Sequence, residues 1–138
     1  MLPSYADSPT IGLARNYREA MTLLTDARDY AAFAARNDAA SAEPFARLRV
    51  NMAAMKLTAC LAGITAWLMA QRAAEVGEIG REETKRGEFR LAQCPLGEAE
   101  TAEVALPPRL LILIRRALTL HERLQRLDRL LEEPPSSA

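Results

Sequence analysis

Apolar residues between positions 44 and 76 recur at alternating spacings of three and four, which is the period of an α-helix. The longer of two stripes contains Phe45, Leu48, Met52, Met55, Ala59, Ala62, Ala66, Met69, Ala73 and Val76. A neighbouring stripe contains Leu57, Leu61, Ile64 and Leu68. Because a helix with two apolar stripes must be covered on two sides, the pattern predicts a central helix over residues 44–76 packed between two others.

Two flanking segments have the periodicity that such covering helices need. The first is expected over about residues 9–36, with Ser8 as N-cap and Pro9 at the first helical position. Its inward stripe is formed by Leu13, Tyr17, Ala20, Leu24, Ala27, Ala31 and Ala34. The second is expected over about residues 107–133, before Pro134. Its stripe is formed by Leu110, Leu113, Ala117, Leu120, Leu124, Leu127 and Leu131.

The connector between the second and third helices, residues 78–106, is charged, interrupted by glycine and weakly periodic. We expect a short helix near Arg81–Arg86, a turn over Cys94–Gly97 and an exposed acidic stretch over Glu98–Val104. The fold class is therefore all-α, an antiparallel three-helix bundle with a partly irregular connector between helices 2 and 3. We expect a single domain over residues 1–133 and a flexible C-terminal tail at 134–138.

Charge and hydropathy narrow the choice of partners. The 18 basic and 18 acidic residues cancel, so no overall field attracts nucleic acid or an anionic membrane. Residues 44–72 carry four basic residues and no acidic one, and we expect these to pair with acids on other helices or to point into water. The longest uncharged run, Leu57–Gln71, has 15 residues. A membrane span requires about 18–20 apolar residues, and no signal peptide is visible, so we expect a cytoplasmic protein.

No set of residues in the sequence is arranged for recognisable catalysis. His121, the single histidine, has only Glu122 beside it and no metal ligand at the usual spacing, which favours a hydrogen-bonded or edge-exposed histidine. Cys60 lies in helix 2 and Cys94 in the connector, without Cys-x-x-Cys spacing, so both are expected to be free thiols. We therefore expect a non-enzyme with no catalytic residue, no cofactor and no metal.

Polar residues gather near the end of the second helix, within an otherwise apolar segment. One interpretation is a partner interface, with the candidate residues Trp67, Gln71, Arg72, Glu75 and Glu78. The alternative is an internal salt-bridge network, for instance between Arg72 and Glu75 or between Arg72 and Asp128. Three long helices make a slender bundle with much surface for its core, which favours a homodimer. Apolar positions outside the main stripe, such as Trp67 and Ile114, are the candidates for the dimer contact.

The sequence resembles a known family at several places in order. The strongest match is the string from Ala66 to Ala73, continuing over Glu75–Ile79, which resembles the central-helix signature of the family of RcdA, the regulator of CtrA degradation, formerly DUF1465. Met55–Thr58, Phe89–Leu91 and Leu120–Leu124 also fit. Together these matches extend over about residues 8–131.

The resemblance implies a three-helix bundle that forms homodimers and regulates the alphaproteobacterial cell cycle without being an enzyme. Family members act as adaptors that bring cargo such as CtrA to the ClpXP protease, together with CpdR-like and PopA-like companion factors. An adaptor acts by raising the effective concentration of cargo near the protease. The alternative is a stand-alone regulator that sequesters one partner by helix-mediated binding and does not deliver it to a protease.

Overall fold

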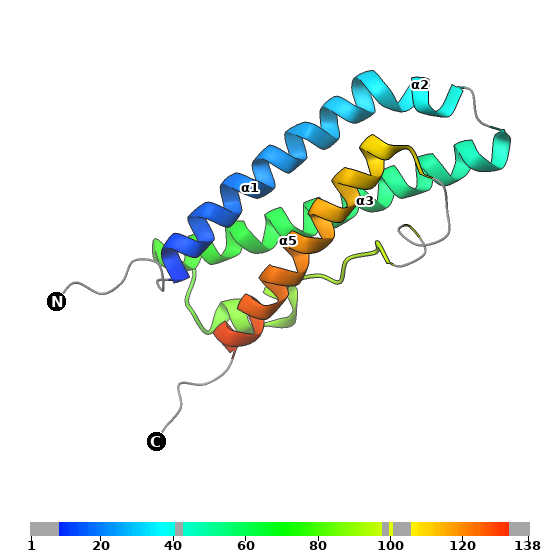
Figure 1. Ribbon diagram of the computed structural model, residues 1–138. Coiled ribbons are helices and arrows are strands. Elements are labelled where there is room, and N and C mark those ends of the chain that lie inside the picture. The colour runs from blue at the N-terminus through cyan, green and yellow to red at the C-terminus, as the bar shows by residue number, and fades with distance from the viewer. Residues whose placement is uncertain (1–8, 41–42, 98–99, 101–105, 133–138) are drawn as a thin grey trace.

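A computed structural model describes residues 9–40, 43–97, 100 and 106–132, and it contains no strand within them. Its long helices are α1 (Pro9–Asp29), α3 (Pro44–Glu75) and α5 (Pro108–Glu132) (Figure 1). Shorter elements are the π-helical turn η2 (Tyr30–Ala34), α2 (Ala35–Ala40) and the 3₁₀ turns η3 (Glu83–Lys85) and η4 (Gly87–Phe89). The expected all-α class is confirmed. The proposed cap Ser8 and the expected tail at 134–138 lie outside the described residues.

The first helical arm, α1 to α2, contains a π-helical turn that the sequence pattern did not predict. A π-turn adds a residue to the local repeat and therefore rotates the side chains that follow it. Tyr30 and Ala34 are buried in this turn, whereas Ala31, which we placed in the inward stripe, is exposed. Leu13, Ala20 and the unpredicted Leu23 are also buried against the other helices.

α3 begins and ends where its local sequence indicates. Pro44 occupies the first turn, where a missing N–H leaves no helical bond unmade. After Glu75, Gly77 adopts a φ of 81°, in the left-handed region that glycine enters without a steric penalty. The N–H of Gly77 bonds to the carbonyl of Ala74 at 3.3 Å, and that of Glu78 to the carbonyl of Ala73 at 2.8 Å. Gly77 is therefore the C′ residue of α3.

α1 runs antiparallel to α5. Arg123, in the second half of α5, bonds to Glu19 of α1 at 2.7 Å. Arg116 lies about two turns before Arg123 on α5, and it bonds to Asp26, which lies about two turns after Glu19 on α1, at 2.8 Å. The order of the partners is thus reversed between the two helices.

α1 also runs antiparallel to α3, because Tyr17 in the first half of α1 lies against Arg72 near the end of α3. It follows that α3 and α5 run in the same direction, as Figure 1 shows. The expected antiparallel arrangement thus holds for α1 with each of the other two helices, but not for α3 with α5. The physical reason is the connector, which carries the chain back along the bundle before α5 begins.

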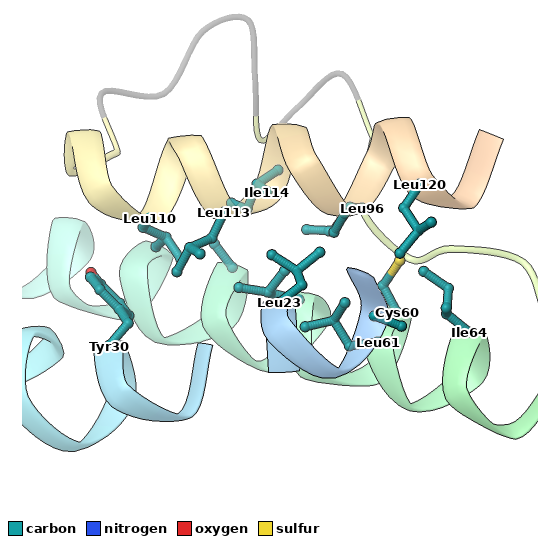
Figure 2. Packing of buried hydrophobic residues seen from close by; sticks show 14 of the residues in the cluster. Leu23, Tyr30, Cys60, Leu61, Ile64, Leu96, Leu110, Leu113, Ile114 and Leu120 are labelled. Atoms are coloured by element: carbon teal, nitrogen blue, oxygen red, sulfur yellow. The ribbon is translucent and has the colours of Figure 1, made fainter. Parts of the chain in front are cut away.

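The core lies between the three long helices and is made mainly of leucine, isoleucine and alanine side chains (Figure 2). α5 contributes the stripe that we predicted, with Leu110, Ala117, Leu120 and Leu124 fully buried. Of its two stripes, α3 contributes the shorter one, Leu57, Leu61, Ile64 and Leu68, to this core, together with Val50, Ala53, Cys60 and Trp67. The longer stripe lies on another face of α3, outside this core.

The connector packs along the bundle and is anchored at several points. Leu96 is buried among the core side chains (Figure 2), and Arg90 bonds to Asp128 of α5 at 3.1 Å. Glu100 is also buried and forms an ion pair with Lys56 of α3, so the expectation of an exposed acidic stretch is wrong at this position. The remaining residues of the stretch, apart from Glu100, lie outside the described part of the chain. The helix expected near Arg81–Arg86 is represented by η3.

Candidate interaction surfaces

The longer apolar stripe of α3 lies on the surface of the molecule. Met55 is 71% exposed, Phe45 69% and Val76 64%, and these values are far above those of a core residue. We call this stripe the outer face of α3. It consists of one half-buried residue, Ala73, and of the exposed residues Phe45, Leu48, Met52, Met55, Ala59, Ala62, Ala66, Met69 and Val76. The expectation that both stripes would be covered within one chain is therefore wrong.

The reason for this exposure is the position of the two covering helices. Both α1 and α5 pack on the side of α3 that carries Leu57, Leu61 and Ile64, each of which is at most 2% exposed. A helix covered by neighbours from one side leaves the opposite part of its circumference in solvent. Scattered apolar residues on a surface are ordinary, but a continuous stripe along a 32-residue helix indicates an interaction surface.

α3 is long and apolar enough to pass a length-and-composition test for a membrane span, with a mean hydropathy of 1.5 over its best window. The core helix of a soluble protein passes the same test. Nine α3 residues are buried inside the bundle, including the polar Gln71, and the Lys56 side chain is held in an ion pair. These observations favour the core-helix interpretation.

Trp67, the first candidate interface residue, is buried. Its indole N–H donates a 3.0 Å hydrogen bond to Oδ1 of Asp128, and Oδ2 of the same carboxylate accepts a 3.1 Å bond from Nε of Arg90. Asp128 is therefore held by α3 on one side and by the connector on the other. These bonds tie together three segments that are far apart in the sequence, and they give Trp67 a structural role inside one chain.

Gln71 lies one turn after Trp67 and is 2% exposed. It is close to Thr84, Lys85 and Asp128, where α3, the connector and α5 meet. Its side-chain oxygen is buried without a hydrogen-bond partner among the described residues. Gln71 is therefore enclosed in the bundle and is not available to a partner protein.

Arg72 and Glu75 point to a different side of α3, toward α1. With Leu13, Tyr17 and other side chains they line a cavity of about 460 Å³ between the two helices. The guanidinium of Arg72 is exposed and lies over the ring of Tyr17, 5.8 Å from its centroid. Within the described residues, neither expected ion pair of Arg72 forms. Asp128 pairs with Arg90 instead, and Oε1 of Glu75 is buried without a hydrogen-bond partner.

The five candidate interface residues therefore do not form one surface. Trp67 and Gln71 face the bundle interior, Arg72 and Glu75 face the groove beside α1, and Glu78 is exposed just after the helix. Ile114, proposed with Trp67 for the dimer contact, is fully buried in the core (Figure 2). Since Trp67 and Ile114 expose almost no side chain, a contact between two chains must use other residues.

The structure supplies no site with evident catalytic geometry among the residues it describes. His121 is buried, and its Nε2 donates a hydrogen bond to the carbonyl of Ala92 at 2.8 Å, which accounts for the histidine as we predicted. No group of three histidine, cysteine, aspartate or glutamate residues in the described ranges is placed to hold a metal ion. The feature that sequence reasoning missed is the outer face of α3, although the regular spacing that produces it is visible in the sequence.

Comparisons with known proteins agree with this architecture. The structure is similar to the crystal structure of RcdA from Caulobacter crescentus CB15, with a TM-score of 0.71 and 30% sequence identity. The similarity covers 86% of this chain and 89% of that one. A search of curated proteins gave no match. A family model described as "Protein of unknown function (DUF1465)" matches residues 8–138, and the chain therefore belongs to this family.

Proposed function

We propose that this chain is a non-enzymatic cell-cycle regulator that works as an adaptor for ClpXP proteolysis in the cytoplasm. The observation that carries the proposal is the outer face of α3, a long apolar surface that one chain leaves uncovered. Similarity to RcdA over most of both chains supports a regulatory role. By the same resemblance, the partners are ClpX with CpdR-like and PopA-like factors, and a cargo such as CtrA.

We propose further that the outer face of α3 joins two copies of the chain. Its positions follow the alternating 3,4 spacing of a coiled-coil seam along the whole helix. The small residues Ala59, Ala62 and Ala66 occupy its centre, where they allow two helix backbones to approach closely. A homodimer with twofold symmetry requires a surface that is complementary to itself.

An antiparallel pairing centred between Ala59 and Ala62 meets this requirement. It places bulky residues opposite smaller or flexible ones. The resulting pairs are Phe45 with Val76, Leu48 with Ala73, Met52 with Met69, Met55 with Ala66, and Ala59 with Ala62. A parallel pairing would instead place each residue opposite its own copy, so that Phe45 would meet Phe45 and Ala66 would meet Ala66. The distribution of side-chain sizes therefore favours the antiparallel dimer.

The dimer is tested by placing a charge at the centre of the outer face. Ala62→Glu should convert a dimer into a folded monomer in light scattering, because a buried, unpaired carboxylate is costly at an apolar contact. Thr119→Glu, on an exposed position of α5, is the matched control and should leave the mass unchanged. A monomeric wild-type chain at tens of micromolar would contradict the dimer, and binding of that monomer to lipid vesicles would assign the face to a membrane.

The adaptor role is tested by titration in a reconstituted degradation assay with ClpXP and the companion factors. An adaptor holds two partners at once, so an excess of it separates them into half-complexes. Degradation of the cargo should therefore rise and then fall as the protein is added. A regulator that only sequesters its partner would protect it increasingly at every concentration. Degradation that does not change across the titration would reject the adaptor role.

A further inference from the structure

The connector brings the two cysteines of the chain together, although they are far apart in sequence. Cys60 lies on the buried side of α3 (Figure 2), and Cys94 lies in the connector, packed against the same core. The two thiol side chains hydrogen-bond to each other. Both are free thiols in the structure.

The residues on either side of Cys94 hold it in this position. Ala92 approaches α3 so closely that a Cβ built on Gly63, one turn after Cys60, would lie 3.4 Å from the Cβ of Ala92. The carbonyl of Ala92 also accepts the 2.8 Å bond from His121. Leu96, on the other side of Cys94, is buried in the core at 5% exposure. The contact between the thiols is thus a consequence of how the connector is anchored.

Solvent reaches one of the two thiols. Cys94 is half-buried and lines an open groove of about 480 Å³, together with Gln93, His121 and Glu122. Cys60 is 2% exposed and does not line this groove. A small oxidant that enters the groove therefore meets Cys94 first.

The two thiols also differ in acidity. The hydrogen bond from Cys60 lowers the pKa of Cys94 to about 7, with a further contribution from the backbone N–H of Leu96, against the opposing effects of burial and of the nearby Glu100 carboxylate. The same hydrogen bond, together with burial, raises the pKa of Cys60. Cys94, the more accessible of the two thiols, is therefore also the more acidic one, and the thiolate is the reactive form.

From this placement we infer that Cys60 and Cys94 are a peroxide-sensitive pair that closes to an intramolecular disulfide. The Cys94 sulfur attacks a peroxide oxygen, the O–O bond breaks, and water leaves after protonation, so that Cys94 becomes a sulfenic acid. The Cys60 sulfur then attacks the Cys94 sulfur, and the S–O bond breaks as the S–S bond forms. The leaving hydroxide takes the proton of Cys60. Two thiols and one hydrogen peroxide thus give one disulfide and two waters.

The product is a covalent link between the connector and α3. In a reducing compartment such a bond would be transient, as it is in proteins that sense oxidants. The bond would fix the segment around Cys94 against the bundle, and a thiol reductant would release it. The site is on the opposite side of α3 from the outer face, so its formation does not depend on dimerisation.

The test uses the full reduced chain and hydrogen peroxide. After oxidation, alkylation of free thiols and digestion with trypsin, mass spectrometry should show the peptide Leu57–Arg72 joined to the peptide Leu91–Arg109. The yield should be independent of protein concentration, and dithiothreitol should reverse the link. Cys94→Ser should abolish oxidation of the protein thiols, whereas Cys60→Ser should leave Cys94 oxidised without the cross-link.

Two results would overturn the inference. One is a wild-type chain in which Cys94 becomes sulfinic acid while Cys60 stays a free thiol, because the second step would then not occur. The other is a cross-link that joins Cys94 of two chains, whose yield would rise with protein concentration. Both results are read from the wild-type protein and therefore do not depend on the folding of a variant.

Discussion

The indole of Trp67 on α3 and the carboxylate of Asp128 on α5 are joined by a 3.0 Å hydrogen bond inside the bundle. The tryptophan stands out in the sequence as an anchor for a partner, but the structure uses it to connect two helices of one chain. Because Arg90 holds the other carboxylate oxygen, the position of the connector depends on the same group. A substitution of Trp67 or Asp128 should therefore lower the stability of the fold directly, and any effect on partner binding should be secondary.

Trp67→Phe should lower the free energy of unfolding by about 1–3 kcal/mol, because it leaves a buried carboxylate oxygen of Asp128 without its donor. Urea unfolding monitored by circular dichroism measures this change. Met69→Leu, two residues away on the outer face, is the control and should leave the stability of the monomeric unit nearly unchanged. Equal stability of the wild type and Trp67→Phe would contradict the role assigned to the bond.

The stability contributed by Glu100 should be lost at acid pH. Burial by itself raises the pKa of this carboxyl, but the bonds from Lys56 and from the N–H of Gly97, together with the charge of Lys56, hold the pKa below its ordinary value of 4.5. A carboxyl whose pKa is lower in the folded state stabilises the protein above its unfolded pKa. That stabilisation decreases as the pH falls through the folded pKa.

Glu100→Gln tests this dependence. The variant should be less stable than the wild type near neutral pH, and the difference should shrink as the pH falls below the ordinary pKa of 4.5 and approach zero once the folded carboxyl is protonated. Urea unfolding of both proteins over this range measures the difference. A constant difference across the range would show that the ionised carboxylate is not the stabilising form.

Arg72→Ala separates a structural role from a binding role on the groove beside α1. The exposed guanidinium lies over Tyr17 and forms no salt bridge with Glu75 or Asp128, so its loss should lower the free energy of unfolding by only about 0.5–1 kcal/mol. If the groove binds a partner, cargo binding should fall well beyond this small change. A large loss of stability with unchanged cargo binding would favour a purely internal role.

Oxidation by peroxide should stabilise the chain if Cys60 and Cys94 join. In the chain-entropy model, closing a loop of this length restricts the unfolded state and contributes about 3–4 kcal/mol. The melting temperature of the oxidised wild type should therefore rise and should return to its starting value on reduction. Cys94→Ser should show no such rise under the same treatment. A lower melting temperature of the cross-linked chain would mean that the bond distorts the native packing.

Local sequence determined the helices of this protein to within a few residues. The periodic leucines of α5 indicate a helix, and Gly77 indicates the place where α3 ends. Both signals are reliable because helix period and left-handed φ are properties of short segments. The π-turn at Tyr30 was not predictable in this way. It changes the register by one residue only, and tertiary packing decides which side chains it turns inward.

The sequence by itself determined that α3 has two apolar stripes, but it could not determine which one the monomer buries. Leu57 and Met55 are both apolar and helical, yet one is in the core and the other is 71% exposed. The stripe that faces α1 and α5 is the one that is buried. The connector returns along the bundle, and α5 therefore runs parallel to α3. The same return placed Cys94 beside Cys60 and Arg90 on Asp128. Spacing along the chain records the period of one helix, whereas contacts between distant segments depend on the path that the whole chain takes.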